Sequence, residues 1–360
     1  MRDKLRFMGV VAVLAVVAAA CAQEEEPVGG GGGQAKPGAD VLACQVTDVG
    51  GIDDKSFNAT AYAGLTRAES ELGTEISFLE SQAQTDYAPN IDEFIAQECD
   101  LIVTVGFLLG DATATAAEAN PEQKFAIVDN DLFDIEAGED LQFDNVRELT
   151  FATDEAAFLA GYLAAGMTQS GKVGTFGGIQ LPTVTIFMDG FAKGVAHHNE
   201  EKGTDVQVLG WNTENEEGLF TGDFENQDNG RRVTEDLISE GADIILPVAG
   251  PVGLGAAAAA QDAGGVNLIW VDTDGCVSAE EYCSLFLTSI EKHMDVAVFD
   301  TIQSVVDDSF QSGLYIGTLE NDGVGISAYH EFEGQVPAEL AAEIEDLKQQ
   351  IISGELSLED

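Results

Sequence analysis

Two glycines and an aspartate that follows them at a fixed spacing form a pattern typical of nucleotide-binding sites. Gly253, Gly255 and the alanines after them read G-x-G-x-x-A between an apolar run and a predicted helix. Asp272 follows about 20 residues later, at the end of the next predicted strand. In dinucleotide-binding proteins such glycines bring a pyrophosphate to a helix N-terminus, and the acid binds a ribose. In a chain with 40 glycines so short a pattern arises readily by chance, so an NAD-type oxidoreductase remains an alternative interpretation.

Other catalytic and metal-binding signatures are absent from the sequence. It contains no G-x-S-x-G elbow, no P-loop and no H-E-x-x-H. Aspartates are too numerous to indicate a hydrolase by themselves. The cysteines lack zinc-ribbon spacing and the four histidines are scattered. We therefore expect a protein that is not an enzyme and that has no metal and no cofactor.

Strand-like and helix-like segments alternate along the chain, and the pattern restarts after Thr150. Apolar strand segments are predicted at 41–47, 76–79, 101–105, 124–128, 173–176, 205–211, 243–247 and 267–271. Single helices of about a dozen residues separate most of them, which is typical of parallel βαβ units. The sequence therefore predicts an α/β protein with two doubly wound parallel-sheet domains.

The domain boundaries follow from this restart. We expect 40–150 with 287–313 to form one ligand-binding domain and 151–286 with 314–360 the other, joined by a hinge that the chain crosses several times. In such sheets a ligand binds beyond the carboxyl ends of the strands. Asp129 and Asp272 both end predicted strands, so we expect their carboxylates to face a cleft between the domains.

The N-terminus has the pattern of an export signal. Arg2, Lys4 and Arg6 precede an uncharged stretch at 7–20, which is too short to span a bilayer and ends in alanines before Cys21. This pattern resembles a bacterial lipobox, with Cys21 as the site of lipid attachment, although an ordinary signal peptide with an incidental cysteine remains an alternative. The acidic and Gly-rich segment 22–39 is predicted to be a flexible tether. We expect a lipid-anchored protein at the extracellular face of the cell membrane.

The chain is strongly acidic, with 65 acidic and 15 basic residues and a formal charge of −50. Such a chain repels a phosphate backbone, so we expect no nucleic-acid partner. High salt screens self-repulsion. A salt-adapted source and an ordinary acidic extracellular protein both account for the composition.

Four cysteines follow Cys21, an even number that favours two disulfides in an exported chain. Three pairings are open. We favour Cys44–Cys99, because each cysteine lies at a neighbouring predicted strand, and Cys276–Cys283, which would close a short loop.

Several sequence blocks occur together in a recognisable order. They are TDVGGIDDKSFNATAYAGL (47–65), FAIVDN (125–130), FLAGYLAAGMTQSGKVGTFGG (158–178), FMDGFAKGV (187–195), LPVAGPVGLGAAAAA (246–260), IWVDTDG (269–275) and TSIEKHMDVAV (288–298). With these blocks the chain resembles the basic membrane protein family, the purine-nucleoside receptors of ABC importers. The resemblance implies a type I periplasmic-binding fold, a purine nucleoside (guanosine, adenosine or inosine) as the ligand, and an ABC permease as the partner. We expect a monomer.

The resemblance also implies residue roles. Phe57 and Phe224 would stack on the two faces of the purine, with Asp48 and Asn58 at the base edge. The remaining expected contacts are to the ribose: the carboxylates of Asp129 and Asp272, the ammonium of Lys292, and the backbone N–H groups of Gly250 and Gly253. A surface receptor that senses such a ligand without transport remains a second alternative.

Overall fold

The computed structural model describes residues 36–134 and 139–358, which contain two parallel-dominated sheets. The first sheet has the order β15-β7-β4-β3-β1-β2 and is parallel throughout. Its strands are β1 (Leu42–Thr47), β2 (Glu75–Glu80), β3 (Leu101–Val105), β4 (Lys124–Val128), β7 (Val146–Phe151) and β15 (Gly313–Gly317). We call this sheet and the helices on it the first lobe.

The helices of the first lobe cover both faces of its sheet. They are α1 (Phe57–Leu72), α2 (Tyr87–Ala96), α3 (Gly110–Ala119) and α9 (Met294–Val306), with short 3-10 turns at η1 (Gln84–Asp86) and η2 (Phe107–Leu109). Side chains of α1 and α9 share one core with β1 and β3, and those of α2 and α3 pack on the opposite face. Alternate strand residues are therefore buried on both sides, as the apolar strand segments predict.

The second sheet has the order β16-β14-β13-β12-β8-β9, and only its edge strand β16 is antiparallel to its neighbour. Its strands are β8 (Lys172–Gly177), β9 (Gln207–Leu209), β12 (Ile244–Val248), β13 (Asn267–Asp272), β14 (Phe286–Lys292) and β16 (Val324–Ile326). We call this sheet and its helices the second lobe. The two sheets confirm the predicted α/β, doubly wound architecture.

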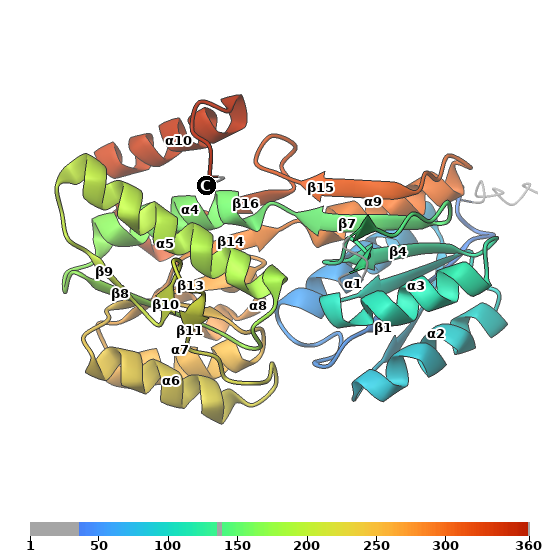
Figure 1. Cartoon of the computed structure of the whole chain (residues 1–360), viewed down its shortest axis with the longest axis horizontal. Helices are drawn as coiled ribbons and strands as arrows, with labels where there is room; N and C mark the ends of the chain where they lie inside the picture. The colour runs from blue at the N-terminus through green and yellow to red at the C-terminus, as the bar shows by residue number, and fades with distance from the viewer. Residues whose placement is uncertain (1–35, 135–138, 359–360) are drawn as a thin grey trace, which may run out of the picture. The chain divides into compact units, whose positions relative to one another are not determined.

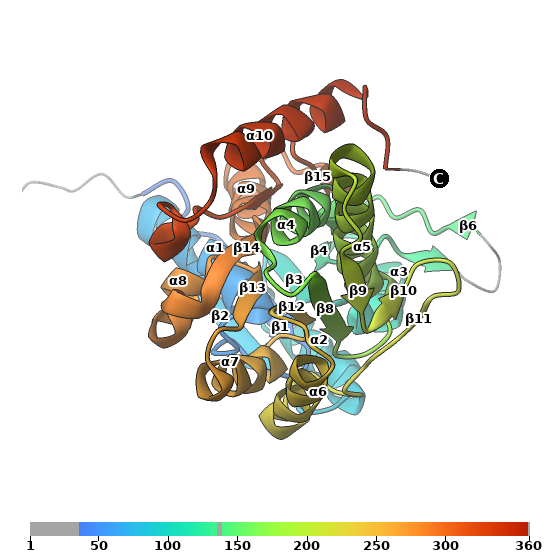
Figure 2. The same cartoon turned by 90° about the vertical axis from the view of Figure 1, so that its left-hand side faces the viewer.

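The helices of the second lobe also lie on both faces of its sheet. They are α4 (Thr153–Met167), α5 (Pro182–Lys202), α6 (Gln227–Ser239), α7 (Val252–Ala263), α8 (Gly275–Ser278) and α10 (Ala338–Ser353), with turns η3 (Glu280–Leu285) and η4 (His330–Phe332). The cores divide α4 and α5 from α6 and α7. Helix α10 lies against α4 (Figure 2), where the Tyr162 hydroxyl donates to Glu343. Two small antiparallel ribbons complete the set: β5 (Phe133–Asp134) with β6 (Glu139–Asp140), and β10 (Trp211–Asn212) with β11 (Glu217–Gly218).

The chain passes between the lobes three times within the described residues. It leaves the first sheet after β7 to enter α4, returns from β14 to α9, and leaves again between β15 and β16 (Figure 1). The multiple crossings that the sequence predicts are present. These crossings are the only chain links between the lobes in the described part, so they are the natural hinge.

Sheet membership corrects two of the predicted boundaries. The segment 287–292 was expected in the first domain, but β14 pairs with β13 in the second sheet. The segment 314–317 was expected in the second domain, but β15 pairs with β7 in the first sheet. Periodicity shows that a segment is a strand and does not show which strand it pairs with, because pairing is decided by tertiary contacts.

The predicted disulfides are both present. Cys44 of β1 is bonded to Cys99, which lies just before β3, and Cys276 is bonded to Cys283.

The end of the predicted tether differs from expectation. Gly38 is buried and its N–H donates to the Leu72 carbonyl, so 36–39 packs on the first lobe. The rest of the predicted tether, the signal segment and Cys21 lie outside the described residues.

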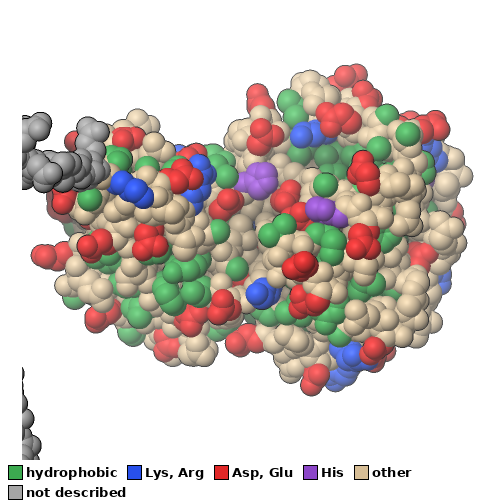
Figure 3. Space-filling view, turned by 180° about the vertical axis from the view of Figure 1, so that it is seen from behind, with side chains coloured by type: hydrophobic (Ala, Val, Ile, Leu, Met, Phe, Trp, Pro, Cys, Tyr) green, Lys and Arg blue, Asp and Glu red, His purple; other side chains and the backbone are tan. Residues whose placement is uncertain are grey.

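On the face shown in Figure 3, acidic side chains are spread widely and not gathered in one patch. Basic side chains are few on the same face, in keeping with the composition. None of the described helices is long and apolar enough to cross a membrane.

Candidate functional site

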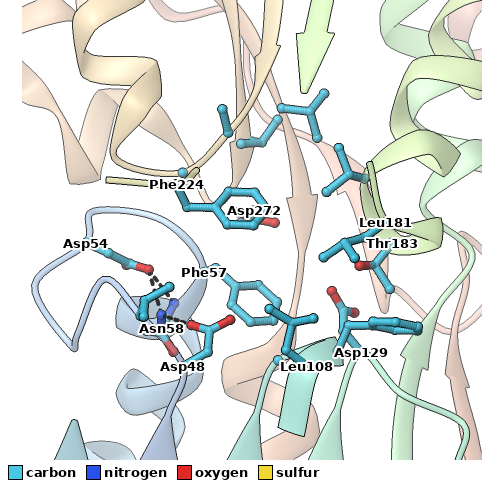
Figure 4. Close-up of a pocket in the computed structure, with 18 of the residues that line it drawn as sticks. Asp48, Asp54, Phe57, Asn58, Leu108, Asp129, Leu181, Thr183, Phe224 and Asp272 are labelled. Carbon is cyan, nitrogen blue, oxygen red and sulfur yellow. Dashed lines mark hydrogen bonds between the residues drawn. The ribbon is translucent and has the colours of Figure 1, made fainter. Parts of the chain in front are cut away.

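A pocket lies where the carboxyl ends of strands from both lobes meet (Figure 4). Its cavity measures about 70 Å³. The first lobe contributes Asp48, Val49, Asp54, Phe57, Asn58, Gly106, Phe107, Leu108 and Asp129. The second contributes Leu181, Thr183, Val184, Phe187, Phe224, Val248, Ala249, Gly250, Pro251, Val271, Asp272 and Lys292. Ligand sites commonly measure about 300–1,000 Å³, so a sizeable ligand requires the lobes to move apart.

The start of α1 is fixed by Asp54. One of its carboxylate oxygens accepts hydrogen bonds from the backbone N–H groups of Ser56 and Ala59, and the other accepts from that of Asn58. An N-terminal helix turn has free N–H donors, and a carboxylate there satisfies them. Burial raises the pKa of the Asp54 carboxyl, and these hydrogen bonds oppose the rise. Asp54 thereby orients Phe57 and Asn58 into the pocket.

Asp48 and Asn58 form one polar wall. The Asn58 side-chain amide donates to Asp48 at 2.8 Å, and its Oδ1 is buried without a hydrogen-bond partner among the described residues. Burial raises the pKa of Asp48 to about 8; the Asn58 hydrogen bond opposes the rise, and the charges of Asp54, Asp129 and Asp272 add to it. A side chain at Gly106 would begin 2.4 Å from the Asp48 carboxylate, and this residue has φ +120. Glycine is therefore required behind Asp48.

Asp129 and Asp272 follow β4 and end β13, and both have left-handed backbone, with φ 62 and φ 69. This turn of the backbone directs the carboxylates into the pocket from opposite lobes. Asp129 accepts a hydrogen bond from the Lys292 ammonium, and Asp272 accepts one from the Ser56 hydroxyl. Both bonds cross between the lobes.

Burial raises the pKa of both carboxyl groups. For Asp129, the charge and hydrogen bond of Lys292 oppose this rise. The pKa of Asp272 is raised to about 6, with Lys292 and Ser56 lowering it and Asp129 and Asp54 raising it. The carboxylates are therefore held in a partly desolvated cluster around one ammonium group.

The Lys292 ammonium is enclosed by aromatic rings. Its Nζ lies 5.0 Å from the centre of the Phe57 ring, 5.4 Å from that of Phe151 and 5.6 Å from that of Phe187. The side chain is 2% exposed. An ammonium over ring faces is electrostatically favoured, and the rings exclude water from the ion pair with Asp129.

Phe57 and Phe224 approach the pocket from different lobes (Figure 4). Phe57 begins α1, and Phe224 lies in the loop before α6. The Phe224 ring packs against Gly178, where a side chain would begin 2.3 Å from the ring. The structure thus brings together eight of the nine predicted ligand-binding residues, including Gly250.

Gly253 is the exception. Its N–H donates to the Gly250 carbonyl at 2.8 Å inside the first turn of α7, so it is not directed at the pocket. A side chain there would begin 3.0 Å from the Trp270 ring, and one at Gly255 would begin 1.9 Å from the Gln227 carbonyl oxygen. The G-x-G-x-x-A glycines therefore allow α7 to pack closely on α6 and Trp270, which accounts for them without a dinucleotide.

Several lining residues were not predicted from the sequence: Asp54, Leu108, Leu181, Thr183 and Phe187. Pro182 at the first position of α5 was a usable signal for Leu181 and Thr183, because it marks a helix N-terminus at the carboxyl edge of the sheet.

One cluster outside the pocket, Asp274, Cys276 and His330, has the spacing of a metal site. Its sulfur belongs to the Cys276–Cys283 disulfide and is not a thiolate ligand.

The comparisons with known proteins agree with this architecture. The model of the family of PnrA-like ABC transporter substrate-binding proteins matches residues 42–360. The chain belongs to this family. The resemblance predicted from the sequence blocks is therefore confirmed, and the chain is an ABC transporter substrate-binding protein.

Individual relatives cover nearly the whole substrate-binding protein. The "ABC transporter nucleoside-binding protein BmpA" of Lactococcus lactis is 29% identical over 90% of this chain and 90% of its own. An "uncharacterized lipoprotein" of Pyrococcus abyssi is 31% identical over 84% of this chain and 72% of its own. A solved ABC transporter solute-binding protein of Aeropyrum pernix has TM-score 0.78 and 28% identity, and covers 88% of this chain and 92% of that one.

Proposed function

We propose that this substrate-binding protein captures a purine nucleoside between its lobes and delivers it to an ABC permease. The arrangement of Phe57 and Phe224 is the observation that carries the proposal, since rings entering from opposite lobes can take a flat base between them. Aromatic stacking favours π systems and tolerates different bases. The nucleoside-binding name of the Lactococcus lactis relative agrees with this choice.

The polar groups at the two ends of the pocket fit the two halves of a nucleoside. At one end, the free Oδ1 of Asn58 accepts from an N–H of the base, and the Asp48 carboxyl lies beside it. At the other end, Asp129, Asp272 and Lys292 supply acceptors and a donor for ribose hydroxyls. Such charge-assisted hydrogen bonds are stronger than neutral ones.

Closure is proposed to occur by a hinge motion at the three crossings. Opening separates Ser56 from Asp272 and Lys292 from Asp129, and the ligand replaces part of these contacts when the lobes close on it. Lipid attachment at Cys21 would hold the protein at the extracellular face of the membrane, beside the permease. The lipoprotein name of the Pyrococcus abyssi relative supports such an anchor.

Thermal unfolding of the full-length chain in detergent, against a ligand panel, tests this function. The panel contains guanosine, adenosine, inosine, cytidine, ribose, hexoses, amino acids and NAD. A ligand at about 100 times its dissociation constant stabilises by about 2.7 kcal/mol, which shifts the unfolding temperature by a few degrees. We expect the shift with purine nucleosides. A shift with a sugar or with NAD alone would contradict the proposal.

A further inference from the structure

A second chamber opens beside the pocket, near the first crossing between the lobes. Its volume is about 180 Å³, against about 70 Å³ for the cavity between the rings. One water needs only about 15 Å³ of such space, so the chamber is large enough for a chemical group and not only for a trapped solvent molecule. Of the residues proposed above to bind the nucleoside, only Asp129 and Lys292 line it.

The chamber continues the pocket at its sugar end. Phe107, Asp129, Thr183 and Lys292 line both spaces. Asp48 and Asn58, at the base end, line the pocket only. With the base held between the rings as proposed, a substituent that extends from the sugar away from the base points past Asp129 into the chamber.

The charges of the chamber disfavour a phosphate. Lys292 is the only cation among the described residues that line it, and its ammonium already donates to Asp129. Asp131 adds an exposed carboxyl. The hydroxyls of Thr150 and Thr153 donate to backbone carbonyls, so they offer no free hydrogen to an anion. A phosphate would meet two carboxylates and one ammonium group that is already paired with one of them.

Apart from Asn130 and Thr183, the remaining walls are apolar. Phe107, Phe151 and Ile186 supply rings and an aliphatic side chain, and Phe151 is 7% exposed. Covering apolar surface of this kind stabilises a bound alkyl group, because apolar area is removed from water. The chamber is therefore suited to a compact uncharged group.

We propose that this chamber admits an uncharged substituent, such as an alkylthio group, on the 5′ carbon of a bound purine nucleoside, and that it rejects a 5′-phosphate. The inference rests on the proposed nucleoside function. It widens the substrate class from plain nucleosides to nucleosides modified at the 5′ carbon.

Calorimetric titration of the full-length chain in detergent tests it with three probes: adenosine, its 5′-deoxy-5′-methylthio analogue and its 5′-monophosphate, with the guanosine and inosine series alongside. We expect the methylthio analogue to bind at least as tightly as the parent nucleoside. The monophosphate is expected to bind about tenfold or more weakly. A methylthio analogue that binds more than about tenfold more weakly than its parent would overturn the proposal.

Ile186→Trp fills the chamber from α5 and leaves the pocket lining untouched, because Ile186 lines only the chamber. We expect this variant to bind the parent nucleoside as before and to lose about tenfold or more for the methylthio analogue. Ile186→Val is the matched control and should bind both. Equal weakening of parent and analogue by Ile186→Trp would contradict a separate chamber. If no nucleoside binds the wild type at all, the proposed function fails and this inference with it, whereas binding of the parent alone overturns only the inference.

Discussion

In the first lobe the polar wall of the pocket is held by hydrogen bonds inside that lobe, whereas in the second lobe the polar groups are bonded across the cleft. Asp54 and the Asp48–Asn58 pair bond to each other and to the start of α1. Asp272 and Lys292 bond to Ser56 and Asp129 of the opposite lobe. The rest of the second-lobe wall is mainly apolar side chains and backbone.

This difference indicates that the two lobes have different roles in ligand binding. At the base end the first lobe presents a preformed half-site, because Asp48, Asp54 and Asn58 keep their partners whether or not the lobes are closed. The second lobe contributes an aromatic lid and two charged groups whose present partners exist only on closure. Base selection should therefore depend on the first lobe, and retention of the ligand on the second.

Removing the disulfides should give the largest effects, and unequal ones. Cys44–Cys99 links residues 55 apart in the first lobe, and Cys276–Cys283 links residues 7 apart in the second. The loop-entropy relation predicts losses of about 4 and about 2.5 kcal/mol. Denaturant unfolding of each paired Cys→Ala variant measures the two losses. An equal or reversed order would show that the first lobe does not depend on its cross-link in this way.

Asn58→Leu and Phe224→Ala should separate selection from retention. Asn58→Leu removes the free acceptor at the base edge, so the ratio of guanosine to inosine affinity should change. Phe224→Ala should weaken all purine nucleosides alike, by about 1–3 kcal/mol, because stacking is insensitive to the base. Titration of both variants with both nucleosides measures these ratios. A change of ratio in Phe224→Ala alone would reverse the assignment of the lobes.

Two carboxyl groups, one in each lobe, should give stability a dependence on pH. An acid whose pKa rises on folding stabilises the folded state below its unfolded pKa, and this contribution is lost as the pH rises through the folded pKa. For Asp48 the contribution should be lost between about 4 and about 8, and for Asp272 between about 4 and about 6. Unfolding temperature should fall as the pH rises, and Asp48→Asn should flatten the part above pH 6 more than Asp272→Asn does. A slope above pH 6 that Asp48→Asn leaves unchanged would remove Asp48 as its source.

Salt should act mainly on the surface of both lobes and little on the pocket. With a formal charge of −50 the folded chain repels itself, and the Debye length falls from about 10 Å at 0.1 M salt to about 3 Å at 1 M. We expect the unfolding temperature to rise with salt while nucleoside affinity changes little, since the pocket charges are buried or paired. A strong loss of affinity with salt would place exposed charges in the binding step.

The sequence predicted the parts of this structure that depend on local patterns. Strand periodicity gave both sheets, and the ends of two strands gave Asp129 and Asp272 at the cleft. The disulfide pairing followed from neighbouring strands and a short loop. Phe57 and Phe224 required the family resemblance, because a single phenylalanine is equally well explained by core packing.

The remaining features depend on tertiary contacts that no local pattern encodes. The partners of β14 and β15 are set by pairing across the sheet, so their lobes were exchanged in the prediction. Nothing in the sequence distinguishes Asp54 from the many other acids. Its role depends on three backbone N–H groups that donate to it in the folded chain. Gly253 matched a ligand-binding motif, yet it serves the packing of α7 on Trp270.

Calorimetric titration of guanosine, adenosine and inosine into the wild type and into Phe57→Ala tests the central claim most directly. The account predicts saturable binding to the wild type, with one nucleoside bound per chain. It predicts a loss of about 1–3 kcal/mol of binding free energy in Phe57→Ala, while the ligand-free variant still unfolds in one cooperative transition. Absence of binding by any purine nucleoside, or equal affinity of Phe57→Ala and the wild type, would contradict it.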